Sequence, residues 1–191
     1  MTQLESYAQH YKDAQALLHS IADDLSDEAF NWKPDAKSWS VGECVVHLNK
    51  ISKGYLDVME DAAAADSPRA GGPFTYGWLT RTFIKAVRPG SRSMSTAPAM
   101  KPPATEGARS AIDKDRALAS YDVDTGRYLQ VITEADGLDL GRIKVASPFL
   151  PIARFKFGGL IEALGLHAMR HVQQAERVTR MDAFPGELAT R

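Results

Sequence analysis

The sequence predicts an all-α protein, built as a four-helix bundle. Apolar residues recur at the three- and four-residue spacing of an amphipathic helix in four long segments of the chain. No segment shows the clean alternation of apolar and polar residues that a half-buried strand requires, and there is no internal repeat. The composition, 44% hydrophobic and 25% charged, is ordinary for a globular protein of 191 residues. Four amphipathic helices bury their apolar faces by packing against one another, which gives a bundle.

The first predicted helix begins near Leu4 and ends near Asp24. Its apolar residues fall at helical spacing, with polar residues between them: Leu4, Tyr7, Ala8, Tyr11, Ala14, Leu17, Leu18, Ile21 and Leu25. A linker over 31–39 follows, because Pro34 ends regular structure there.

The second predicted helix starts after Ser40 and runs to about Ala65. Ser40 and Glu43 have the spacing of a capping box, in which the side chain of each residue satisfies a backbone N–H of the other. One broad face then carries Cys44, His47, Leu48, Ile51, Tyr55, Val58 and Met59.

A long connection over 66–107 joins the second helix to the third and is rich in proline and glycine. We expect one short helix inside it, near residues 76–87. Connections of this length in a compact domain are usually functional lids or disordered insertions. We therefore predict one domain over 1–191 that contains a lid-like connection.

The third and fourth long helices are predicted near 108–135 and 157–181. Glycines in 137–141 end the third helix, and 145–151 is a second turn-rich connection. We expect the tail, 183–191, to be frayed.

Charge and cysteine content exclude several classes of protein. The net charge of −1 offers no basic footprint for nucleic acid, and no segment approaches the ~20 apolar residues of a membrane helix. The N-terminus lacks the basic and apolar regions of a secretory signal. One cysteine, Cys44, excludes an internal disulfide framework. We expect a cytoplasmic protein without nucleic-acid or membrane partners.

Three histidines form a candidate metal site. His167 and His171 lie four residues apart in the fourth helix, so their rings stack one turn apart on one face. His47 lies on the second helix, and if the two helices pack face to face, three neutral nitrogens converge. Three protein ligands with room for water or substrate are typical of catalytic rather than structural zinc sites. The alternative is a set of half-buried or hydrogen-bonded histidines. His10 and His19 lie on the first helix without a matching partner.

The neighbours of these histidines have two interpretations each. Cys44 is a fourth ligand or nucleophile, or a small core residue, which we favour. Glu43 contacts the site or only caps the helix, and we favour the cap. Gln174 orients a histidine or bonds the backbone. Trp39 packs over a helix end, our preferred interpretation, or walls a substrate pocket. Ala168 replaces the glutamate of the zincin His-Glu-x-x-His motif, which argues against a protease of that type because its base is missing.

The combination of Trp39-Ser40-x-x-Glu43-x-x-x-His47-Leu48 with His167-x-x-x-His171-x-x-Gln174 resembles the DinB/YfiT superfamily of four-helix bundles. The resemblance implies that His47, His167 and His171 bind a divalent metal, zinc or nickel first, iron or manganese as alternatives. Characterised members include thiol-dependent transferases and isomerases that use bacillithiol or mycothiol, while many members have no known activity.

Three functions are therefore compatible with the sequence. The first is a metal-dependent transferase that takes a low-molecular-weight thiol and a second small-molecule substrate. The second is a metal-dependent hydrolase. The third is a non-catalytic, stress-related bundle that binds metal or a partner and forms a homodimer. No catalytic residue beyond the metal ligands can be assigned from the sequence.

Overall fold

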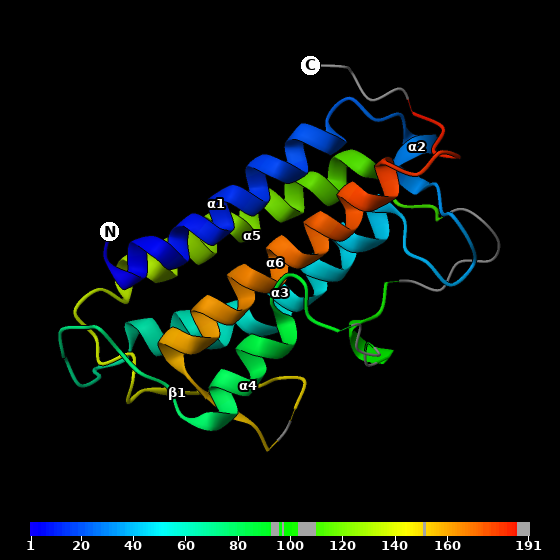
Figure 1. Ribbon diagram of the computed structural model, residues 1–191. Helices are drawn as coiled ribbons and strands as arrows, with labels where there is room; N and C mark the ends of the chain where they lie inside the picture. The colour runs from blue at the N-terminus through cyan, green and yellow to red at the C-terminus, as the bar shows by residue number, and fades with distance from the viewer. Residues whose placement is uncertain (93–95, 97, 103–109, 151, 187–191) are drawn as a thin grey trace.

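Four long helices form a bundle in the computed structural model, which describes residues 1–92, 96, 98–102, 110–150 and 152–186. They are α1 (Gln3–Ala22), α3 (Val41–Ala64), α5 (Lys114–Glu134) and α6 (Phe157–Thr179). α1 and α3 each pack against both α5 and α6 (Figure 1). The predicted all-α bundle is confirmed. No helix in the described part of the chain is long and apolar enough to cross a membrane.

Side-chain caps set where the helices begin. Ser40 accepts a hydrogen bond from the Glu43 N–H, and Glu43 accepts one from the Ser40 N–H, so the predicted capping box is present. α5 begins at Lys114, later than the predicted start near 108. Asp113 accounts for the difference because its carboxylate accepts a hydrogen bond from the Arg116 N–H. Residues 108 and 109 lie outside the described part of the chain.

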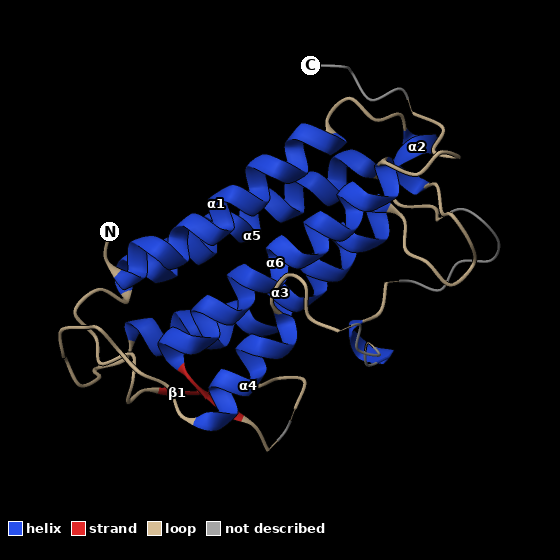
Figure 2. Cartoon of the chain, in the orientation of Figure 1, coloured by secondary structure: helices blue, strands red, loops and turns tan. Residues whose placement is uncertain are grey.

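The structure adds two elements that the sequence analysis missed. A short helix, α2 (Asp27–Asn31), is capped by Ser26. Two strands, β1 (Lys144–Ala146) and β2 (Arg154–Lys156), pair antiparallel at one end of the bundle (Figure 2). The sequence does not predict either strand, because it shows no clean alternation of apolar and polar residues. Strands of three residues are too short to show a period of two, although Val145 and Phe155 do alternate inward.

The 66–107 connection is partly helical. α4 (Trp78–Val87), which the sequence predicts near 76–87, packs against α6, and η1 (Pro98–Met100) lies against α3. Residues 93–95, 97 and 103–107 lie outside the described part. In the predicted tail, Phe184 packs edge-on against Trp32, with 5.6 Å between ring centroids. Residues 187–191 are not described.

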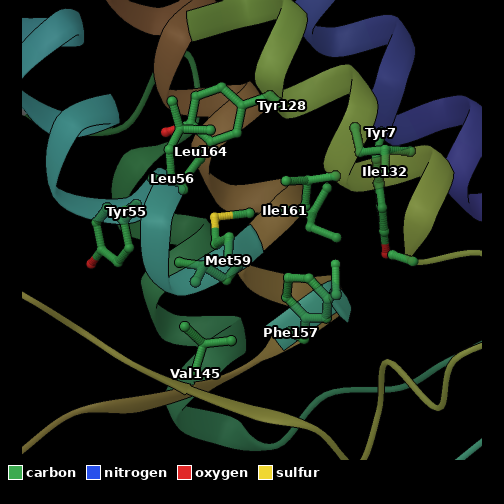
Figure 3. Close-up of a cluster of buried hydrophobic side chains, with 14 of the residues drawn as sticks. Tyr7, Tyr55, Leu56, Met59, Tyr128, Ile132, Val145, Phe157, Ile161 and Leu164 are labelled. Carbon is green, nitrogen blue, oxygen red and sulfur yellow. The ribbon is translucent and has the colours of Figure 1, made fainter. Parts of the chain in front are cut away.

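Two apolar clusters fill the bundle, and the histidines lie near their boundary. The first cluster surrounds Met59 and Ile161 near the strand end (Figure 3). The second surrounds Leu18 and Phe30 near α2. Along α6, the first cluster reaches Leu164 and the second begins at Ala168, and His167 stands between them. The fold thus inserts polar rings into the middle of its core.

Candidate metal centre

The three predicted histidines come together where α3 packs against α6. His47 projects from α3, and His167 and His171 project from α6. The centroid of the His171 ring lies 4.5 Å from those of His47 and His167, which are 5.3 Å from each other. One ring nitrogen from each residue lies within 4.8 Å of the other two. The predicted convergence of the three rings is therefore confirmed.

The spacing of the nitrogens fits a shared metal ion. His47 Nε2 and His167 Nε2 are 3.1 Å apart. Two nitrogens that bind one tetrahedral zinc ion at about 2.0–2.1 Å lie about 3.3 Å from each other. The observed separation is close to that value, so the two rings need only a small adjustment to share one ion.

Hydrogen bonds orient two of the rings. His47 Nδ1 lies 2.7 Å from the Met100 carbonyl oxygen, and His171 Nδ1 lies 3.0 Å from the Gln174 Oε1. Both oxygens can only accept, so each Nδ1 carries the proton and donates. Each of these two rings then has its lone pair on Nε2, and the Nε2 of His47 faces that of His167. Of the two interpretations of Gln174 that the sequence leaves open, its hydrogen bond with His171 favours the one in which it orients a histidine.

His167 is oriented differently. Its Nδ1 is buried and has no hydrogen-bond partner within the described residues. An unpaired buried polar group costs about 1–3 kcal/mol, so a protein tolerates one where function requires the ring. The void beside His167 has a volume of about 20 Å³, and the side chains of Ser52 and Thr125 line it.

All three rings are held neutral. Burial is the main cause in each case, and it lowers the pKa of His47 and places that of His167 well below the ordinary range. The pKa of His171 falls to about 3, because burial, and then His47 and Arg170, disfavour its charged form. A metal needs the neutral imidazole, so the rings are ready to bind at pH 7 without losing protons.

Trp39 forms a wall of the site. Its ring stacks on His171 at 5.6 Å with an interplanar angle of 25°, and it lies 5.0 Å from the His47 ring. The sequence favours packing of Trp39 over a helix end, but the structure instead favours the interpretation in which Trp39 forms a pocket wall. A pocket of about 450 Å³ opens beside Trp39, His171 and Gln174.

The other two neighbours have structural roles. Cys44 is 1% exposed, belongs to the apolar cluster around Phe30, and has a pKa raised by burial. A thiol in that setting is inert, which confirms the core interpretation. Glu43 caps α3 and also forms a buried ion pair with Lys33, with 3.0 Å between Oε1 and Nζ.

These features define a class: helical bundles with an open, three-histidine site that could hold a metal ion. The chain belongs to the DinB superfamily, whose family model matches residues 10–175 and so includes both histidine-bearing helices. The resemblance seen in the sequence is thereby confirmed. No curated protein and no solved structure gives a significant match to the chain.

Proposed function

We propose that His47, His167 and His171 hold one divalent metal ion, zinc or nickel first, and that the protein is a metal-dependent transferase using a low-molecular-weight thiol. The observation that carries the proposal is the convergence of three neutral imidazoles beside a pocket. Membership of a metal-binding family supports it. Three protein ligands leave coordination positions for a substrate.

A bound metal would supply positive charge that favours the thiolate form of a substrate thiol, which is the nucleophilic form. The residues of the chain do the rest. Met100 and Gln174 hold the rings of His47 and His171 in position, and Trp39 covers the rings from the pocket side. The thiol proton leaves to solvent through the pocket. The sulfur then bonds to an electrophilic carbon of the second substrate, whose leaving group departs with the bonding electron pair.

Metal-dependent hydrolysis is the second candidate. A hydrolase needs a general base near the attacking water. Within the described part of the chain, no aspartate or glutamate lines the pocket beside His171. A thiol needs no such base once its pKa is lowered, so the lining favours thiol transfer over hydrolysis.

Two measurements test the proposal. Elemental analysis of protein purified without chelator should give one metal ion per chain. Thiol consumption should then be followed with an electrophilic aromatic substrate and several small thiols. Conjugation that disappears in His171→Ala, while helical content is unchanged, supports the proposal. A metal-loaded protein that consumes no thiol with any substrate contradicts the transferase function and leaves a metal-binding bundle.

A further inference from the structure

The pocket beside the histidines has the size of a small-molecule site. Its volume of about 450 Å³ lies within the range of about 300–1,000 Å³ that is usual for ligand pockets. His171, Gln174 and Trp39 connect it to the candidate metal centre. A ligand in the pocket would therefore contact the same ring that faces the other two histidines.

Four cationic side chains line this pocket, and no acidic side chain does so among the described residues. They are Lys37, Lys101, Arg170 and Arg177. Lys37 precedes α3, Lys101 follows η1, and the two arginines lie two turns apart on one face of α6. The tertiary fold, not a local run of basic residues, gathers these charges.

Among the described residues, no carboxylate forms an ion pair with the cations of the pocket, although Asp35 lies close enough to Lys37 to interact with its charge. Arg170 donates to the carbonyl oxygens of Ala86 and Arg92. Its third partner is the Ser91 hydroxyl, so none of its partners is charged. By contrast, Arg127 on α5 binds two carboxylates.

The helix dipole accounts for the cation at only one of the four pocket positions. Arg177 lies in the last turn of α6, where the partial negative charge of the helix C-terminus favours a cation. Lys37, Lys101 and Arg170 have no such local reason. Like charges that face one cavity repel, and an anionic ligand would remove that repulsion.

We propose that this pocket binds a small dianion, carried by carboxylate or phosphate groups, beside the three histidines. A guanidinium group can donate two parallel hydrogen bonds to two oxygens of either group, and lysine ammonium groups add point charges. A transferase of the proposed kind uses two substrates, a thiol and an electrophile. The pocket would bind whichever of these two carries the negative charge. This last step rests on the proposed function, whereas anion binding itself does not.

The test is a calorimetric titration of the full-length chain, both zinc-loaded and after chelation, with succinate, inorganic phosphate and acetate. The double variant Lys37→Gln/Arg177→Gln removes two exposed pocket cations that have no structural hydrogen bond in the described part. Arg81→Gln/Lys85→Gln is the matched control, since it removes the same charge from the exposed face of α4. We expect succinate or phosphate to bind the chelated protein more tightly than acetate. Affinity should fall at least about tenfold in the pocket variant and stay unchanged in the control.

Which of the two dianions binds identifies the anionic group, and either result supports the proposal. Equal losses in both double variants would contradict it, because only overall charge would matter. The proposal is also overturned if neither dianion binds the native chain at millimolar concentration. Zinc titration of the native chain, beside its anion titration, separates the two proposals. Normal zinc binding without anion binding refutes the pocket alone, and normal anion binding without zinc binding refutes the metal site alone.

Discussion

Histidines in two parts of this bundle have opposite electrostatic settings. His19, on the surface of α1, lies 2.7 Å from Asp23 and 2.8 Å from Asp122, and the bond to Asp122 is the main cause of its raised pKa. His47, His167 and His171 have no carboxylate partner in the described part of the chain, and burial lowers their pKa values. The surroundings thus favour the charged form of histidine on the surface and the neutral form in the core. Environment, rather than residue type, decides which histidines can bind metal.

The largest expected effect comes from removing one buried ring. His171→Ala should abolish stoichiometric zinc or nickel binding, with a loss larger than the about 10–100-fold that removal of a supporting residue costs. His19→Ala should bind metal as the native chain does, because its ring is already bonded to carboxylates. Calorimetric titration measures both, and circular dichroism confirms that the helices remain. Equal metal affinities in the two variants would show that the buried ring of His171 is no more important for metal binding than the surface ring of His19.

Acidification should destabilise the metal-free protein through the buried rings. In the unfolded chain, His171 takes up a proton near pH 6.5, whereas in the folded chain its pKa of about 3 keeps it neutral. The unfolded state therefore binds more protons between these values, and the free energy of unfolding falls as the pH falls. For His171 the loss from pH 6.5 to 5 is about 2 kcal/mol.

Urea unfolding of the native chain and His171→Leu at both pH values measures this difference. The variant should lose less stability on acidification by that amount. His19 has the opposite sign, because its raised pKa gives stability that is present below pH 6.5 and lost as the pH rises through the raised value. An identical pH dependence in the native chain and His171→Leu would show that the buried ring is not held neutral.

A smaller effect is expected from the residue that orients His171. Gln174→Ala removes the acceptor of the Nδ1 proton, 3.0 Å away. Metal affinity should fall about 10–100-fold, since the ring can then turn or change tautomer. Gln174→Glu keeps an acceptor oxygen and should retain most of the affinity. The amide oxygen has no orienting role if the alanine variant binds zinc as tightly as the native protein.

The smallest effect on stability is expected from removing the ring of His19 on the surface of α1. His19→Ala removes the contacts with Asp23, which is exposed, and with Asp122, which is half-buried at the surface. Exposed ion pairs contribute about 0–1 kcal/mol, so the melting temperature should change little at pH 7. Calorimetry of this variant in low and high salt provides the check. A loss of several kcal/mol would mean that the pair has a structural role beyond its charge.

The sequence was sufficient to predict the bundle and the histidine trio because both depend on local pattern. Helical spacing places His167 and His171 on one face, and the Ser40–Glu43 capping box fixes the start of the helix that carries His47. Only the packing of that helix against the last one had to be assumed.

Features that depend on distant segments could not be predicted. The basic stretch over 81–92 stands out in the sequence, yet its cations are exposed and do not line the pocket. Lys37, Lys101 and Arg177, which do, share no motif and are brought together by the fold. The hydrogen bond from His47 to Met100 likewise joins residues 53 positions apart. No periodicity or spacing rule connects such positions before the chain is folded.

X-ray absorption spectroscopy of the zinc-loaded protein tests the central claim most directly. The structure predicts three imidazole nitrogens at about 2.0–2.1 Å, with oxygen completing the shell. A sulfur at about 2.3 Å would instead indicate Cys44, and a shell of oxygens alone would indicate surface carboxylates. Either of these results would contradict a metal centre formed by His47, His167 and His171.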